Sequence, residues 1–220
     1  MKLLVVVMSI TLMSVSWITQ DLWRWWGDPR PPAIQGVLLP SPATLESFVL
    51  RDHEQRAFTH RQLEGRWHIL AYGFTQCPEF CPTLLKQLAE VMSLLEADEE
   101  RKSLQVLFYS VDPERDASDQ LKRYVNYFHP DFIGLRRDDS SSFLSFEKSL
   151  GIVYQVDAQN PQLGYSVNHG TMLYLINPQG KLQAIFKPSK NTIGELVFVA
   201  ETLFADYISI RNYTKSIKTG

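Results

Sequence analysis

Short apolar runs and amphipathic segments alternate along most of this chain. Six runs are rich in β-branched and aromatic side chains and predict buried strands, at 68–74, 104–111, 132–135, 152–156, 171–176 and 182–186. Amphipathic segments at 84–95, 121–128 and 140–150 predict helices, because their apolar residues recur at helical spacing. A hairpin is expected over 48–58. The Thr192-x-x-Glu195 pattern predicts the start of a last helix, which would bury Leu196, Val199 and Leu203 or their neighbours.

The order of these elements predicts an α/β fold. Strands that alternate with helices form a sheet with helices packed on it. The last two strands flank Asn177-Pro178-Gln179-Gly180, a turn sequence that makes them an antiparallel hairpin. A β-α-β-α-β-β-α order, with two cysteines at the first strand-to-helix junction, is the thioredoxin-like arrangement, here with an N-terminal hairpin in front.

The first 26 residues differ in kind from the rest. Residues 3–18 carry no charge, and four of the chain's five tryptophans stand at 17, 23, 25 and 26, where they suit a membrane–water interface. Lys2 favours an orientation with the amino terminus in the cytoplasm. We therefore expect a single membrane anchor helix at 1–26, with an exported domain behind it. A cleaved signal peptide is the alternative.

The composition of the remaining residues predicts a linker, a domain and a tail. The prolines and glycines between 27 and 44 predict a linker, followed by a thioredoxin-like domain at 45–207 and a C-terminal tail at 208–220. The chain of 220 residues has a net charge of −2, so no basic surface indicates a nucleic-acid partner. Two cysteines are too few for a disulfide-stabilised scaffold.

The two cysteines, Cys77 and Cys81, follow a buried strand and precede a helix. Residues four apart lie on one face of a helix, so both thiols can converge on one ion. Thiols at a helix N-terminus also have a lowered pKa, which suits thiolate chemistry. The pair therefore indicates a site for Cu(I), zinc or an iron–sulfur cluster, or a redox-active dithiol. A plain stabilising disulfide, or a pair of buried thiols, is the structural alternative.

A third ligand is sought among the five histidines. His53, His60, His68 and His129 are expected at the surface or in the core with their hydrogen bonds made. His169 differs, because it stands just before the strand at 171–176. In a thioredoxin-like sheet the loop entering that strand faces the cysteine helix, so His169 is the candidate ligand.

Four segments carry a resemblance to a known family. They are GFTQCPEFCPT at 73–83, YSVDPERD at 109–116, YFHPDFIGL at 127–135 and NHG at 168–170. With the anchor and the proline-rich linker, they resemble the SCO/SenC proteins, membrane-anchored copper proteins needed to assemble cytochrome c oxidase. The resemblance covers about residues 48–204, and the motifs are highly specific in this order.

The resemblance implies one copper ion per chain, held by Cys77, Cys81 and His169. It implies a metallochaperone that delivers copper to the CuA centre of cytochrome c oxidase subunit II. Other periplasmic copper carriers or thiol reductants would be further partners. The expected location is the bacterial inner membrane, single-pass, with the domain in the periplasm. The mitochondrial inner membrane, with the domain on the intermembrane-space side, is the alternative.

Two other functions stay open from the residues. In a thiol–disulfide oxidoreductase, Cys77 would attack a disulfide of the same CuA site and Cys81 would resolve the mixed disulfide. A thiol peroxidase would share the fold, but its motif is missing. The chain departs from the family pattern at bulky Phe80 and at Asn168, where an aspartate is common. Asp112 and Asp116 are expected to shape a loop rather than to bind metal.

Overall fold

The computed structural model describes residues 30–95, 103–138, 140–157 and 165–219. The anchor expected at 1–26 lies outside the described residues. Within the described part of the chain, no helix is long and apolar enough to cross a membrane. Residues Ala33–Tyr207 form one compact unit, which holds the whole sheet and both cysteines.

The described elements alternate as the sequence pattern predicts, with additional strands. The strands are β1 (Gly36–Thr44), β2 (Val49–Asp52), β3 (Ala57–Thr59), β4 (Trp67–Gly73), β5 (Leu104–Ser110), β6 (Ile133–Arg137), β7 (Tyr154–Asp157), β8 (Ser166–His169), β9 (Leu173–Ile176), β10 (Lys181–Phe186), β11 (Ser189–Lys190) and β12 (Leu196–Val197). The helices are η1 (His60–Leu63), α2 (Phe80–Leu94), α3 (Ser118–Phe128), α4 (Phe143–Leu150) and α5 (Ala200–Thr219).

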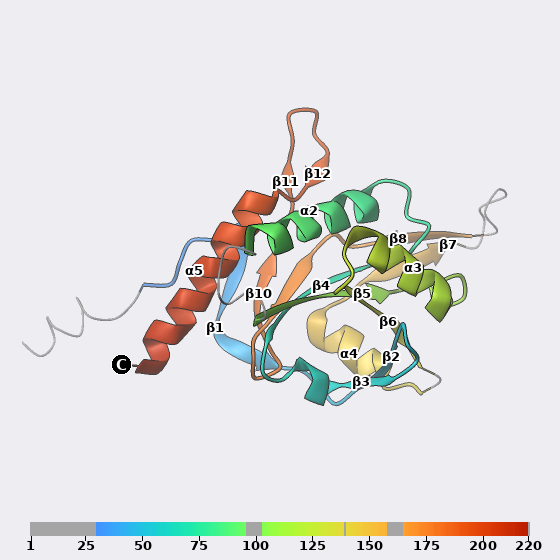
Figure 1. Ribbon diagram of the computed structural model, residues 1–220, viewed down its shortest axis with the longest axis horizontal. Helices are drawn as coiled ribbons and strands as arrows, with labels where there is room; N and C mark the ends of the chain where they lie inside the picture. The colour runs from blue at the N-terminus through green and yellow to red at the C-terminus, as the bar shows by residue number, and fades with distance from the viewer. Residues whose placement is uncertain (1–29, 96–102, 139, 158–164, 220) are drawn as a thin grey trace, which may run out of the picture. The chain divides into compact units, whose positions relative to one another are not determined.

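An eight-stranded sheet in the order β1-β10-β9-β4-β5-β6-β2-β3 is the centre of the unit (Figure 1). β4, β5 and β6 run parallel, and the outer strands pair antiparallel. Every residue of β4 and of β5 is buried. Their nearly continuous apolar sequences follow from this, since central parallel strands are covered on both faces.

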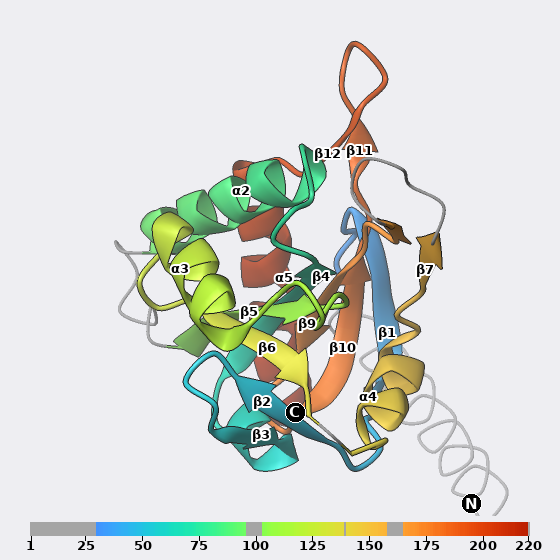
Figure 2. The same ribbon diagram turned by 90° about the vertical axis from the view of Figure 1, so that its right-hand side faces the viewer.

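Neighbouring residues of β5 show how the helices cover the two faces. Phe108 packs against Tyr124 of α3, with ring centroids 5.6 Å apart. Tyr109 packs against Phe146 of α4 at 5.3 Å. Successive side chains of a strand point to opposite faces, so α3 and α4 cover opposite faces of the sheet. Figure 2 shows α2 beside α3 and α4 on the other side.

The structure differs from the expected linker at 27–44, because Gly36–Thr44 forms β1. This strand pairs antiparallel with β10 at the edge of the sheet and has an irregularity between Leu38 and Ala43. Pro40 and Pro42 lie within that irregularity. Proline lacks an N–H and is tolerated in edge strands and bulges, so a proline-rich sequence can still form this strand.

The prediction that a helix starts at Thr192 is wrong. Asn191 Oδ1 accepts hydrogen bonds from the backbone N–H groups of Ile193 and Glu195, at 3.0 and 2.9 Å. These bonds close the turn of the β11–β12 hairpin, because an asparagine side chain competes with helical hydrogen bonding. α5 begins only at Ala200 and runs to Thr219, so it includes most of the expected tail. Leu203 is buried as expected, whereas Leu196 and Val199 are exposed.

Candidate metal centre

The loop between β4 and α2 places the two cysteines. Cys77 precedes the helix, and Cys81 lies in its first turn, since α2 begins at Phe80. The spacing predicted that the two thiols share one face of a helix. They do not, because Cys77 lies outside the helix. A turn brings them together instead: the N–H of Cys77 donates to the Phe74 carbonyl at 3.2 Å, and the N–H of Cys81 approaches Cys77 Sγ at 3.5 Å.

His169 joins the cysteines from the end of β8. Its Nε2 lies 3.5 Å from Cys81 Sγ. The two Sγ atoms and one ring nitrogen of His169 all lie within 4.8 Å of one another, and we call this group the Cys–Cys–His cluster. Both cysteines are free thiols, Cys81 fully buried and Cys77 8% exposed. In a trigonal metal site with bonds of about 2.0–2.3 Å, the ligand atoms are roughly 3.5–4 Å apart. The cluster fits one ion with small side-chain adjustments.

The hydrogen bonding of His169 leaves the right nitrogen for a metal. Nδ1 lies 2.7 Å from the carbonyl oxygen of Gly170. A carbonyl accepts only, so Nδ1 carries the proton and Nε2 offers its lone pair toward Cys81. Asn168 is exposed and makes none of these contacts. The backbone carbonyl of Gly170 thus orients the His169 ring without a carboxylate at position 168.

Three aromatic rings surround the imidazole of His169. Tyr72 and Phe74 lie at centroid distances of 5.8 Å, and Phe80 at 6.3 Å, all edge-on. Tyr72 and Phe74 come from the end of β4 and the residue after it, and Phe80 opens α2. The bulky side chain at position 80 therefore packs beside the candidate ligand and limits the rotation of its ring.

Gly73 provides the space for the Cys81 sulfur. A Cβ at this position would lie 2.3 Å from Cys81 Sγ and 3.4 Å from the His169 ring. No side chain larger than hydrogen fits there without moving the sulfur. A glycine at the last residue of β4 is thus a requirement of the cluster that the sequence motif contains but does not explain.

Asp116 ties the cysteine loop to β5. Its fully buried carboxylate accepts hydrogen bonds from Thr75 N at 3.0 Å, Thr75 Oγ1 at 2.6 Å and Ser110 Oγ at 2.6 Å. Burial raises the pKa of Asp116, although these hydrogen bonds oppose the rise. Asp112 instead accepts from Arg115 and from Tyr165 Oη. Neither aspartate belongs to the Cys–Cys–His cluster, in agreement with the loop-shaping role expected for them.

The two thiols have opposite pKa shifts. A hydrogen bond from the Cys81 thiol lowers the pKa of Cys77, burial opposes this, and His169 lowers the pKa further. The same contact and burial raise the pKa of Cys81. Two adjacent thiols share one proton readily, and the second ionisation is then opposed by the first charge. In metal-free protein Cys77 is therefore the nucleophilic thiolate. The hydrogen bond from Cys81 lowers its pKa, rather than the end of the helix.

A family model described as SCO1/SenC matches residues 39–202. The chain belongs to the SCO1/SenC family. As a SCO1/SenC protein it has the mixed α/β, thioredoxin-like fold that its elements predicted. The family motifs at 73–83 and 168–170 are the segments that the fold brings together at the Cys–Cys–His cluster.

Individual relatives of this SCO1/SenC chain include proteins from bacteria, plants and animals. A protein of Stutzerimonas stutzeri, provisionally named copper-binding, is 37% identical over 67% of this chain and 71% of its own length. The mitochondrial SCO2 homolog of Danio rerio is 35% identical over 77% of this chain and 56% of its length. The chain thus spans about half the length of the mitochondrial relatives it matches.

A solved structure similar to this one is that of Arabidopsis thaliana ScoI with copper bound. It is 30% identical, with a TM-score of 0.67, over 78% of this chain and all of that chain. Bradyrhizobium japonicum ScoI with copper bound is 26% identical, with a TM-score of 0.63, over 78% and 99% of the two chains.

Proposed function

We propose that this chain binds one copper ion through Cys77, Cys81 and His169 and delivers it to the CuA centre of cytochrome c oxidase subunit II. The convergence of two sulfurs and a free Nε2 within 4.8 Å carries the proposal. Thiolates select soft ions such as Cu(I). Membership of the SCO1/SenC family and the copper-bound relatives support the choice of copper.

The geometry of the cluster suits transfer better than permanent storage. Three ligands leave a coordination position for a thiolate of the receiving protein, so copper passes by ligand exchange. His169 is half-buried at the end of a two-stranded hairpin, and Cys77 stands in a loop. Cys81 lies in the first turn of α2 and is fully buried. We infer that His169 and Cys77 release the ion first and Cys81 last.

A second candidate function is reduction of the disulfide of the same CuA site. The free thiols and the lowered pKa of Cys77 favour it. Cys77 attacks the disulfide, one sulfur of the partner leaves as a thiolate, and Cys81 then displaces the second partner sulfur while the Cys77–Cys81 disulfide forms. This reaction needs no histidine ligand.

We further propose that the domain is exported and lies in the bacterial periplasm, held by residues 1–26 at the inner membrane. The uncharged stretch at 3–18 and the tryptophans behind it support this arrangement. Fractionation of cells that produce the full chain tests it. Recovery of the chain in the soluble cytoplasmic fraction would contradict the proposal.

Metal analysis separates the two functions. Purified chain, loaded with Cu(I) and washed, should hold one copper, and Cys77→Ala, Cys81→Ala and His169→Ala should lose it. His60→Ala is the matched control, because His60 lies outside the Cys–Cys–His cluster. His169→Ala should still reduce an oxidised CuA domain if the second function operates. Copper binding by His169→Ala as tight as that of the wild type would show that the ligand set is wrong.

A further inference from the structure

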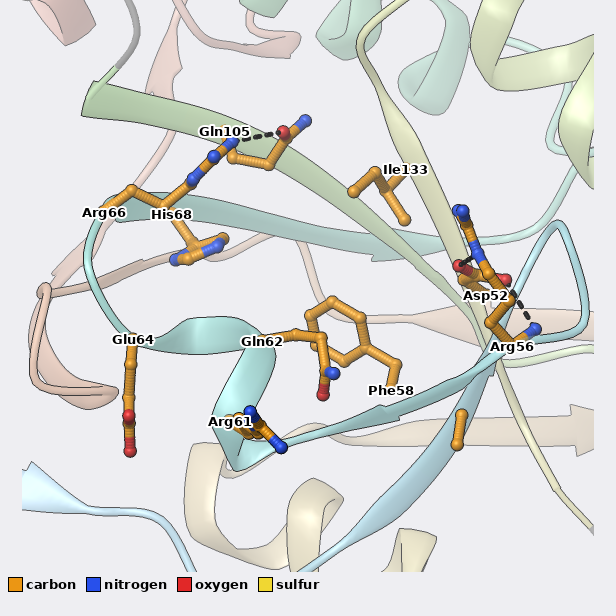
Figure 3. A pocket seen from close by; sticks show the side chains of 11 residues that line it. Asp52, Arg56, Phe58, Arg61, Gln62, Glu64, Arg66, His68, Gln105 and Ile133 are labelled. Carbon is orange, nitrogen blue, oxygen red and sulfur yellow. Dashed lines mark hydrogen bonds and ion pairs between the residues drawn. The ribbon is translucent and has the colours of Figure 1, made fainter.

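A pocket of about 500 Å³ opens at the amino ends of the central strands (Figure 3). Its lining comes from β2, β3, η1 and the first residues of β4, β5 and β6. We call it the arginine-rimmed pocket, after Arg56, Arg61 and Arg66 at its edge. The Cys–Cys–His cluster follows the other end of β4, about 20 Å away along seven residues of strand.

His68 is the feature of this pocket that the fold does not explain. It lies in the middle strands of the sheet, 1% exposed, and Figure 3 shows its ring turned to the pocket. Its Nδ1 has no hydrogen-bond partner of good geometry. A buried polar atom without a partner costs roughly 1–3 kcal/mol. We expected His68 to be a core histidine with its bonds made, and Nδ1 departs from that expectation.

Further polar groups converge on the same space. Gln105 is paired in register with His68 on β5 and is itself buried. Its Oε1 accepts a long hydrogen bond of 3.4 Å from Arg66. Gln62 uses its side-chain oxygen to accept from Thr59 at 2.8 Å, which leaves its NH₂ group to donate elsewhere. The NH₂ group of Gln105 donates to the backbone carbonyls of Val106 and Asp131, so Gln105 is satisfied within the protein, and Gln62 supplies the NH₂ group that remains for a ligand.

The charge balance of the pocket favours an anion. Asp52 is already bound by Arg56 at 2.8 Å, so this pair contributes no net charge. Among the described residues, Arg61 and Arg66 form no ion pair, and Glu64 is the remaining carboxylate of the lining. His68 is neutral, because burial, followed by the charge of Arg66, lowers its pKa to about 3. One positive charge remains on the rim.

We propose that the arginine-rimmed pocket binds a small organic anion, with its carboxylate or phosphate group at Arg66. Guanidinium groups recognise both oxyanions with paired N–H donors. The NH₂ of Gln62 completes the polar contacts. The apolar body of the ligand lies against Phe58 and Ile133, which form one wall of the pocket. The volume suits a molecule of metabolite size.

Binding should be measured by titration calorimetry on the purified full chain with benzoate and phenyl phosphate. Both probes have a flat apolar body, and their difference tells a carboxylate ligand from a phosphate ligand. Benzamide, which has the same ring without the charge, is the neutral control. ¹⁵N labelling of glutamine side chains adds a local signal, since the amide resonances of Gln62 and Gln105 should shift on binding.

Arg66→Gln should weaken binding of the preferred probe at least about tenfold, because it removes a charged donor. Arg123→Gln is the matched control: it removes the same charge from an exposed position of α3 and should leave affinity unchanged. Copper content should be unaltered in both variants, so this result is independent of the Cys–Cys–His cluster. Absence of binding for both anions, benzamide binding as tight as benzoate, or full affinity in Arg66→Gln would each overturn the proposal.

Discussion

The contact between Gly73 and Cys81 allows a sharp test of the Cys–Cys–His cluster. In Gly73→Ala the new Cβ would lie 2.3 Å from Cys81 Sγ, whereas ordinary van der Waals contact begins at 3.4 Å. The sulfur or the strand must therefore move by about 1 Å. Cys81 is fully buried on a rigid helix turn, so the strain cannot be relieved by rotation into solvent.

A shift of that size exceeds the tolerance of a metal site by a wide margin. Ligand distances in such sites are held to about 0.2 Å, and even loss of a supporting contact costs about 10–100-fold in metal affinity. We expect Gly73→Ala to bind Cu(I) at least about 100-fold more weakly than the wild type. The fold should lose only about 1–3 kcal/mol, the usual cost of overpacking.

The measurement is competition for Cu(I) against a chromogenic chelator, with thermal unfolding followed in parallel. Gly134→Ala is the matched control, because its Cβ would meet Leu121 at 2.5 Å in the core beside α3. It should lose similar stability and keep copper. If Gly73→Ala is folded and holds copper as tightly as the wild type, Cys81 does not bind the ion in this geometry.

Three further predictions concern the acidity of Cys77, the ion pair of Arg115 and the burial of His68. In metal-free protein, Cys77 should be alkylated rapidly at pH 6, and Cys81→Ala should slow that reaction, because it removes the hydrogen bond that lowers the pKa of Cys77. Arg115→Gln should cost about 3 kcal/mol in chemical denaturation, since it leaves the buried Asp112 carboxylate without its ion pair. Stability should fall by up to about 1.4 kcal/mol per pH unit between pH 6 and 3, relative to His68→Gln, because unfolding lets the neutral His68 take up a proton.

Each of these predictions has a control or a contrary result. Lys122→Gln removes an exposed ion pair with Glu54 and should leave stability unchanged, in contrast to Arg115→Gln. Equal alkylation rates for Cys77 in both proteins would show that Cys81 does not set its acidity. The His68 prediction has a defined sign: its pKa is below the unfolded value, so stability is lost as pH falls. Parallel pH profiles for wild type and His68→Gln would refute it.

Local sequence patterns predicted the elements that carry their own signal. β4 and β5 are continuous apolar runs, and α2 shows an apolar stripe at helical spacing. α4 follows the predicted segment at 140–150, and Gly151 ends it in the left-handed conformation that favours glycine. The pattern failed where a local signal was ambiguous. Thr192-x-x-Glu195 fits a capping box, but Asn191 closes a hairpin turn at the same place.

Local sequence patterns did not predict which strands pair with each other. β1 is rich in proline, and only the presence of β10 beside it makes it a strand. β8 is four residues long and was missed, because its pairing with β7 gives no periodic signal of its own. Long-range pairing depends on the whole sheet, so a window of sequence does not contain it.

The sequence by itself determined that two thiols stand at a strand–helix junction and that the chain resembles the SCO/SenC proteins. Only the tertiary structure decided how the candidate ligands meet. Cys81 and His169 are 88 positions apart, yet their ligand atoms are 3.5 Å apart. The antiparallel pairing of β9 with β4 puts the start of β9, and His169 before it, at the end of β4. Gly73 then leaves the space that a side chain would fill.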